Sequence, residues 1–272
     1  MKLIISNSSK ANKFTNIFNN LKNFSETTNM IFSEKGLYIQ GMDKSQCCLF
    51  ELKINNDWFD SYEFQKSKDA EKIGISNSIM HKILNTRRDN QKINISYLGN
   101  PDKLSIHFVN EDNEENEKNE QIKTEFNKKI DIPLMDIESQ LLSVPTTEYE
   151  AEITISSNMM REIVDELSIF NDKLEICLNE ENINLKSSGV EGEMGITINN
   201  DDIIEYAIIE NGNLKQSYSI KFFKLMTGFN KLSSEVKLGF SEVNPMLMLY
   251  SLETNNSESN YIKFYLAPYI ND

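Results

Sequence analysis

The sequence is poor in the residues on which disulfide frameworks and zinc sites depend. Its 272 residues include three cysteines and two histidines, and two of the cysteines, Cys47 and Cys48, are adjacent. An odd number of cysteines with an adjacent pair does not fit a disulfide framework. A zinc site is also disfavoured, because the sequence contains neither a Cys-x-x-Cys pair nor a His-Glu-x-x-His stretch.

Long apolar runs are missing as well. No stretch approaches the ~18 apolar residues that a membrane-spanning helix needs. The apolar segment within residues 1–6 is too short for a secretory signal peptide. We therefore expect a protein that stays in a reducing compartment inside the cell and does not enter a membrane.

Catalytic motifs are equally scarce. The sequence lacks the G-x-x-x-x-G-K-[ST] phosphate loop, the G-x-S-x-G nucleophile turn and the G-x-G-x-x-G dinucleotide motif. His81 and His107 are isolated. The sequence thus predicts no enzyme, no metal and no cofactor. Because 42 acidic residues make chance carboxylate pairs such as Asp201-Asp202 unavoidable, composition alone leaves a metal-dependent nuclease open.

Positive charge is in short supply, and its distribution is uneven. The chain has 28 basic and 42 acidic residues, a net charge of −14, which taken alone argues against a nucleic-acid partner. Four segments, 8–24, 76–88, 156–170 and 217–231, show helical periodicity. Three of them contain three basic residues each and no acidic one, whereas 156–170 holds Arg161 against three acids. If these helices share one surface, that surface attracts a phosphate backbone without reading its sequence. The predicted DNA-facing residues are Lys10, Lys13, Lys22, Lys82, Arg87, Arg88, Arg161, Lys221 and Lys224.

The rest of the chain alternates like half-buried antiparallel strands, for example in 37–52, 92–109, 152–156 and 236–250. We expect the first helix to start at a serine cap, Ser8 or Ser9. The fold class is therefore predicted to be α+β, with two helices and many strands in each half.

An internal repeat organises the chain. A turn followed by a strand at residues 32–39 returns 146 residues later at 178–185, and Phe24 and Phe170 end helical segments at the same offset. Asn-Pro turns occur near the end of each half, at 100–101 and 244–245. We predict one domain at 1–133, a connector at 134–147 and a second, similar domain at 148–272. Residues 111–120 carry six acids and one lysine, which predicts an acidic surface loop at about 110–122.

Specific residues then resemble the proliferating cell nuclear antigen (PCNA) family of DNA sliding clamps across nearly the whole chain. The strongest match is FSEKGLYIQGMDKS at 32–45, and KFYLAPYI at 263–270 is similar to the carboxyl-terminal residues of the family. LMDIESQLLSVP at 134–145 resembles its interdomain connector, and LKSSG at 185–189 resembles one of its strand-and-turn segments. These four matches fall in the expected order along the chain.

The resemblance implies a closed homotrimeric ring, with helices lining the inner face and antiparallel sheets outside. Such a ring encircles duplex DNA and tethers DNA polymerase and other replication and repair proteins, which makes it a processivity factor. It implies loading by a separate ATP-driven clamp loader, and a place in the nucleus or at another site of DNA replication.

The resemblance also implies a pocket for a short helical motif with aromatic and aliphatic anchors. The matching positions here are Met42, Gln46, Cys47, Leu49, Leu142, Val144, Pro145, Pro245, Tyr265, Leu266, Ala267 and Pro268. At the subunit boundary it implies edge-strand pairing between Ile130 and Ile132 of one copy and Met194 and Ile196 of the next. The third helix departs from the family pattern, because family basic positions fall on Glu162 and Asp165.

Two alternatives remain open besides a homotrimeric clamp and a nuclease, and the altered third helix motivates the first of them. One is a subunit of a heterotrimeric, checkpoint-type clamp. The other is an acidic protein-binding scaffold without DNA function.

Overall fold

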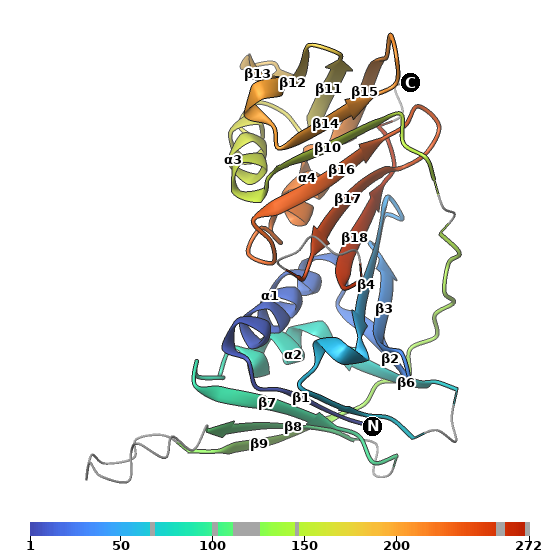
Figure 1. Cartoon of the computed structure of the whole chain (residues 1–272), viewed down its shortest axis with the longest axis vertical. Coiled ribbons are helices and arrows are strands. Elements are labelled where there is room, and N and C mark those ends of the chain that lie inside the picture. Colours follow the sequence, from blue (N-terminus) through green and yellow to red (C-terminus); the bar gives the residue numbers. More distant parts are fainter. Residues whose placement is uncertain (66–68, 100–102, 111–125, 145–146, 254–258, 270–272) are drawn as a thin grey trace, which may run out of the picture. The chain divides into compact units, whose positions relative to one another are not determined.

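The computed structural model describes residues 1–65, 69–99, 103–110, 126–144, 147–253 and 259–269. Its contacts divide the chain into two compact units (Figure 1). Unit 1 comprises Met1–Ile39 and Lys53–Ser139, and unit 2 comprises Gln40–Leu52 and Gln140–Asp272. No helix among the described residues is both long and apolar enough to cross a membrane. The predicted acidic loop lies, apart from Asn110, outside the described residues, as do Pro145 and the Asn100-Pro101 turn.

The described residues of the first half form twelve elements. In chain order they are β1 Lys2–Ile5, α1 Ser8–Phe24, β2 Thr27–Ser33, β3 Gly36–Met42, β4 Cys48–Asn55, the short helix η1 Asn56–Trp58, β5 Ser61–Glu63, β6 Glu71–Ser76, α2 Asn77–Leu84, β7 Gln91–Ser96, β8 Lys103–Asn110 and β9 Lys128–Pro133.

The second half repeats this order element by element. It contains β10 Ala151–Ser156, α3 Ser157–Leu167, β11 Lys173–Asn179, β12 Asn182–Gly189, β13 Gly192–Asn199, η3 Asn200–Asp202, β14 Glu205–Ile208, β15 Asn213–Ser219, α4 Ile220–Thr227, β16 Glu235–Phe240, β17 Met246–Ser251 and β18 Tyr261–Leu266. The internal repeat predicted from the sequence is therefore present in the described elements.

Strand pairing repeats as well. The order β5-β1-β7-β8-β9 of the first half corresponds to β14-β10-β16-β17-β18 of the second. The order β6-β2-β3-β4 likewise corresponds to β15-β11-β12-β13, and the β2–β3, β2–β6, β11–β12 and β12–β13 pairs are antiparallel. In addition, β18 has β4 as its other neighbour. This pairing explains why Gln40–Leu52 belongs to unit 2 although it comes from the first half.

Each helix buries one apolar face against its own unit. On α1 the buried residues are Ala11, Phe14, Ile17, Phe18, Leu21 and Phe24, the face that the periodicity predicts. The bounds of α1 agree with the prediction, but its cap does not: Asn7 accepts the hydrogen bond from the Lys10 N–H, in place of Ser8 or Ser9.

The other three helices are shorter than predicted. The segment 217–231 shows the reason most clearly, because Ser217–Ser219 pair with β11 and the helix begins only at Ile220. A strand partner 40 residues or more away in the sequence overrides the local helical pattern there.

Candidate nucleic-acid interface and partner pocket

In unit 1, α1 and α2 form a helix pair whose polar side carries basic residues and no acid. His81 on α2 joins the two helices: its Nε2 lies 2.7 Å from the Lys22 ammonium, and its Nδ1 lies 2.6 Å from Asn19 Oδ1 on α1. Because an ammonium can only donate, Nε2 accepts, and Nδ1–H donates to Asn19. This arrangement requires a neutral imidazole.

The basic residues predicted to face DNA from unit 1 have different surroundings. Lys82 and Arg88 are exposed, and Lys13 and Lys22 are half-buried. The Lys10 ammonium donates to the Trp58 carbonyl at 2.5 Å and lies 5.4 Å from the centre of the indole ring, so its charge is held beside η1. The Arg88 guanidinium lies 5.5 Å from the ring of Phe126, which is itself 61% exposed.

Arg87 does not lie on the surface as predicted. Its side chain is 3% exposed. The guanidinium donates to the carbonyl oxygens of Arg88, Asp89 and Gln91 at 2.9–3.1 Å, and to Asn12 Oδ1 on α1. These bonds satisfy the backbone of the turn between α2 and β7 and fasten it to α1, so this cation is unavailable to a phosphate.

The asparagines of α1 present a neutral surface. Asn16 and Asn20 each donate a side-chain amide hydrogen bond to the carbonyl four residues earlier, both at 2.9 Å. Such bonds keep the side chains close to their own helix. Between the lysines, α1 therefore offers short polar groups rather than further charge.

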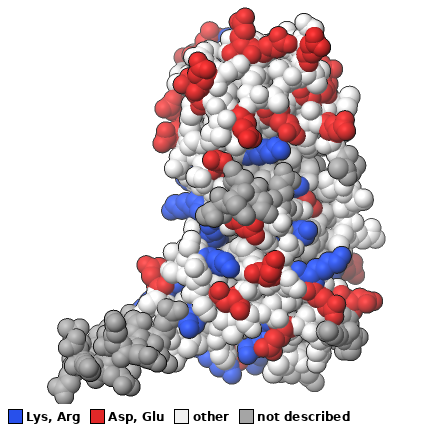
Figure 2. Space-filling model, in the orientation of Figure 1, with Lys and Arg blue, Asp and Glu red and all other residues white. Residues whose placement is uncertain are grey.

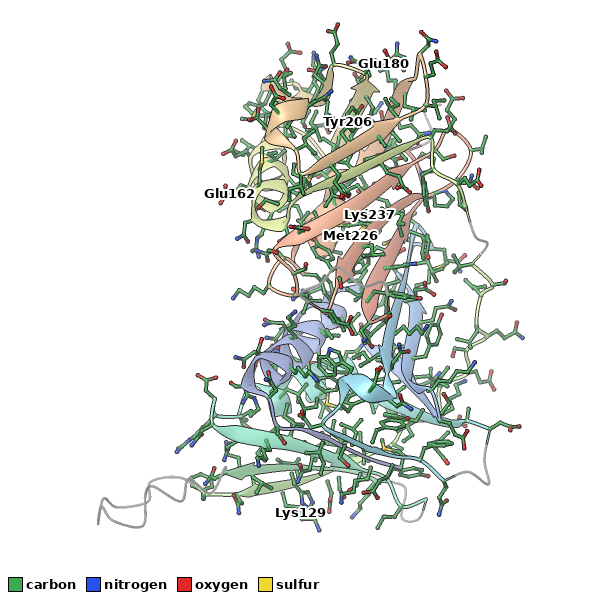
Figure 3. All side chains as sticks on the ribbon, in the orientation of Figure 1. Lys129, Glu162, Glu180, Tyr206, Met226 and Lys237 are labelled. Atoms are coloured by element: carbon green, nitrogen blue, oxygen red, sulfur yellow. The ribbon has the colours of Figure 1, made fainter. Side chains whose placement is uncertain are left out.

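In unit 2, one carboxylate offsets two of the three predicted cations of α3 and α4. Asp165 on α3 lies 3.6 Å from Arg161 Nε and 3.1 Å from the Lys224 ammonium on α4. Lys224 also donates to Ser168 Oγ at 3.0 Å. Lys221 remains exposed, and so do Glu162 and Glu166, with Glu162 projecting outward from α3 (Figure 3). The helix pair of unit 2 is therefore far less basic than that of unit 1.

Many acidic side chains of unit 2 lie in its turns and short helix, among them Glu180, Glu181, Glu191 and Asp201. Figure 2 shows them gathered over the part of unit 2 that contains β11, β12 and β13. The basic helices expected from the sequence are thus present in unit 1, whereas α3 and α4 of unit 2 carry as many acidic as basic residues.

The described residues among those predicted to form a partner pocket all belong to unit 2. The β3–β4 turn is organised by Asp43, whose carboxylate accepts hydrogen bonds from the backbone N–H groups of Ser45, Cys47 and Cys48 at 2.6–2.7 Å. Gln46 adopts a positive φ of 57° in this turn and is exposed. The Cys47 carbonyl accepts from the Ala267 N–H at 2.9 Å, which brings the turn beside the end of β18.

Around this turn, most of the predicted pocket residues keep accessible surface. Leu142 is 49% exposed. Met42, Cys47, Leu49, Val144 and Tyr265 are half-buried, and Pro245, Ala267 and Pro268 are exposed. Leu266 differs from the prediction: it is 1% exposed and belongs to the core, because alternate residues of β18 point inward.

Tyr265 is held by a buried acid. Its hydroxyl donates to Glu51 Oε1 at 3.1 Å, and the Tyr261 hydroxyl donates to the same oxygen at 3.3 Å. Burial and then the Glu51 carboxylate raise the pKa of Tyr265, so that the phenol remains a donor. The ring of Tyr265 is thereby fixed with part of its surface accessible.

Two family models match the chain. The model of the proliferating cell nuclear antigen N-terminal domain matches residues 6–139, and that of the C-terminal domain matches residues 143–269. The chain belongs to the proliferating cell nuclear antigen family.

Among curated relatives, the proliferating cell nuclear antigen of Chaetomium thermophilum is 26% identical over 259 residues, which cover 93% of this chain and 92% of that protein. Proliferating cell nuclear antigen 1 of Plasmodium falciparum is 26% identical over 268 residues (94% and 93%). The Dictyostelium discoideum protein is 27% identical over 268 residues (96% and 97%).

This PCNA-family chain is a DNA sliding clamp, and its fold is the α+β fold with two similar halves that the resemblance implied. The relatives favour a clamp over a checkpoint-type subunit or an acidic scaffold. The family consists of non-catalytic processivity factors that act in replication and repair. Membership implies binding of DNA and partner proteins and assembly as a trimer.

Sequence reasoning missed the residues that fasten the clamp's connector. Gly74 on β6 bridges to Met135, and an added Cβ there would lie 2.1 Å from the Met135 carbonyl oxygen. Asn29 on β2 donates to the Ile137 carbonyl at 3.1 Å and to Ser139 Oγ at 2.7 Å. Gln40 on β3 contacts Leu142. The family-like stretch 32–45 contains Gln40, but nothing in the sequence pairs it with a residue 102 positions away.

The four residues predicted at the subunit boundary lie on edge strands. Ile130 and Ile132 belong to β9 and Met194 and Ile196 to β13, and each strand ends its sheet among the described residues. Ile132 is 5% exposed and packs inward, whereas the other three are half-buried.

Proposed function

We propose that three copies of this chain close into a homotrimeric ring around duplex DNA, with the four helices of each copy on the inner face. The proposal is supported by the basic α1–α2 pair in an otherwise acidic protein. Lysines and exposed arginines on such a surface attract phosphates at every step of the duplex and carry no sequence preference. Retention on DNA then comes from encirclement, so each contact can be weak.

The ring is proposed to close by pairing of β9 with β13 of the next copy. The internal repeat supports this pairing, because β18 corresponds to β9 and β4 corresponds to β13, and β18 has β4 as its neighbour. Repeating the same junction between chains removes both free edges. Ile130 and Ile132 would then face Met194 and Ile196 across the boundary.

Within this ring, the proposed DNA contacts are Lys13, Lys22, Lys82, Arg88 and Lys221. Lys10 lies beside η1, and we propose that it adds to the positive electrostatic potential that attracts phosphates. Arg161 and Lys224 contribute less because Asp165 lies within 3.6 Å of both. Arg87 is left out of this set, since its guanidinium is 3% exposed.

Partner proteins are proposed to dock on unit 2, at the surface formed by the β3–β4 turn, the connector and the end of β18. Accessible side chains of Met42, Leu142 and Tyr265 support a site for a helical turn with aliphatic and aromatic anchors. We propose that DNA polymerase, a clamp loader and repair proteins use this site at the place of replication, such as a nucleus, and that the clamp itself catalyses no reaction and needs no cofactor.

A charge reversal tests the DNA-encircling role. We expect a variant with Lys22, Lys82 and Lys221 all changed to Glu to lose most stimulation of a cognate polymerase and most retention on nicked circular DNA after loading. The matched control changes Lys35, Lys53 and Lys103, which lie outside the helices, to Glu and should behave like the unaltered clamp. Equal behaviour of the two triple variants would contradict the proposed inner face.

A further inference from the structure

The side chain of Gln40 binds both polar groups of one connector residue. The Leu142 N–H donates to Gln40 Oε1 at 2.7 Å, and Gln40 Nε2 donates to the Leu142 carbonyl at 2.9 Å. Both residues belong to unit 2. Two opposite strands exchange hydrogen bonds in the same reciprocal way, so the glutamine amide acts as one half of a β-bridge.

We call this pair of hydrogen bonds between Gln40 and Leu142 the clasp. It matters because no helix or strand holds the connector around Leu142. Residues 136–144 belong to no helix or strand, and residues 137–139 are fastened separately within unit 1 by Asn29 and Lys72. Beyond Ser139, in the described part of the connector, Gln40 supplies both hydrogen bonds that the structure gives Leu142. The backbone of Leu142 thus depends on one side chain.

We propose that Gln40 is a positioning residue for partner recognition. Its amide fixes the Leu142 backbone, and the Leu142 side chain, 49% exposed, then meets an incoming helical turn in a set orientation. Ordering this residue in advance lowers the entropy that a partner loses on binding. The inference rests on the proposed partner site and identifies which group keeps part of it in place.

A glutamate at position 40 allows the two hydrogen bonds to be broken and restored by changing the pH. In Gln40→Glu, an ionised carboxylate can only accept, so it repels the Leu142 carbonyl oxygen and the reciprocal pair of hydrogen bonds cannot form. A protonated carboxylic acid has one donor and one acceptor and can remake both bonds. Gln40→Glu should therefore lose the clasp at pH 7 and regain it below the carboxyl pKa, near ~4.3 in an unperturbed glutamate. Gln40→Ala cannot regain it.

The first readout is hydrogen exchange at the Leu142 amide in the full-length clamp, expressed as a protection factor so that the intrinsic pH dependence cancels. At pH 7 we expect Gln40→Ala and Gln40→Glu to lose protection by about threefold or more, the size of one or two exposed hydrogen bonds. At pH 4, Gln40→Glu should regain most of that protection, and Gln40→Ala should not. Ser143→Ala, at an exposed neighbouring side chain, is the matched control and should leave Leu142 unchanged.

The second readout is the affinity of a synthetic peptide that carries aliphatic and aromatic anchors on one helical turn, measured by calorimetry at pH 7. We expect about three- to tenfold weaker binding in both Gln40 variants, with oligomeric state and DNA retention unchanged. Unaltered Leu142 exchange in Gln40→Ala would overturn the clasp. Faster exchange with unchanged peptide affinity would overturn its role in recognition. Failure of the unaltered clamp to bind the peptide would overturn the partner site itself, and the exchange experiment, which needs no peptide, separates that result from a failed clasp.

Discussion

Lys22 and His81 illustrate how single side chains tune the basic surface of unit 1. The imidazole accepts from the Lys22 ammonium at 2.7 Å, so a proton on Nε2 would break that bond and add a second positive charge beside the first. Burial, then Lys22, then Lys82 lower the pKa of His81 from its ordinary 6.5. The ring therefore stays neutral at physiological pH, and the positive charge at this point belongs to lysine.

We predict that the pKa of His81 lies below 6.5. The contribution of His81 to the stability of the folded chain should therefore depend on pH. Between the folded-state pKa and the ordinary value, the unfolded chain binds a proton that the folded chain does not. The contribution is therefore fully present above pH 6.5 and decreases as the pH falls through the folded-state pKa. An NMR titration of the ring checks this, and Lys22→Met should raise the pKa of His81. A value at or above 6.5 in the unaltered clamp would contradict the contact.

Gly74 is a second residue whose role follows from geometry. A Cβ at this position would lie 2.1 Å from the Met135 carbonyl oxygen and 3.0 Å from Ile137 Cδ1. We predict that Gly74→Ala releases the start of the connector from β6, with faster hydrogen exchange at the Met135 amide and about 1–2 kcal/mol loss of stability from the broken bonds. Gly195→Ala, whose added methyl group meets nothing within 4 Å in the single chain, is the control for exchange at Met135. Unchanged exchange at Met135 in Gly74→Ala would show that the contact is not needed.

The surroundings of single side chains were the feature that the sequence predicted least well. Arg87 and Arg88 are adjacent and identical, yet one guanidinium is buried in its own turn and the other is exposed. Arg87 bonds mainly to backbone carbonyls, which every residue carries, so no pattern of side chains predicts it. Leu266 was misplaced for a related reason: the strand places alternate residues inward, and its register was not known from the residue type.

Among the elements, α3 and α4 differ most from α1 and α2. Asp165 lies between Arg161 and Lys224, with all three side chains 44–47% exposed. Exposed ion pairs of this kind add little to the stability of the fold. They do, however, weaken the positive electrostatic potential at the helix surface. The charge of this helix pair is therefore adjustable without disturbing the fold.

We predict that Asp165→Asn strengthens the hold of the loaded clamp on duplex DNA. The change frees two cations, and each added phosphate contact steepens the salt dependence of binding by about 0.9 in logarithmic units. Slower loss from linear DNA, measured over a range of salt concentrations, checks the prediction. Glu152→Gln, which removes an equal charge from the Lys237 pair on β10 and β16, should have little effect. Unchanged or faster loss in Asp165→Asn would argue against α3 and α4 facing DNA.

Helix existence was predictable from the sequence, and helix ends were less so. The apolar face of α1 spans Ala11 to Phe24 without interruption, which made both of its limits clear. The start of α4 was placed too early, because Ser217–Ser219 are drawn into pairing with β11. The ion pair between Asp165 and Lys224 joins two helices separated by dozens of residues in the sequence, so its effect on charge appears only after folding.

For the whole molecule, the repeat was the strongest prediction. It followed from a few offsets in the sequence, and the described elements repeat in the same order in both halves. The junction between β18 and β4 could not be foreseen, since it depends on which edges remain after each sheet forms. That junction is what gives the proposed ring its repeating geometry.

A substitution on β9 tests this geometry. We predict that Ile130→Asp shifts the clamp from trimer towards monomer, because a charge would be buried between paired edges, at a cost of several kcal/mol if it remains ionised. Circular dichroism of the variant should remain native, since β9 is an edge strand. Ile31→Asp, at an equally half-buried position on β2, should stay trimeric. A trimer that tolerates Ile130→Asp would place the boundary elsewhere.

The mass of the unaltered protein in solution tests the central claim most directly. Light scattering coupled to size-exclusion chromatography at micromolar concentration should give three times the 31.4 kDa of one chain. A stable monomer of 31.4 kDa that nevertheless binds linear DNA tightly would contradict a ring that holds DNA by encirclement.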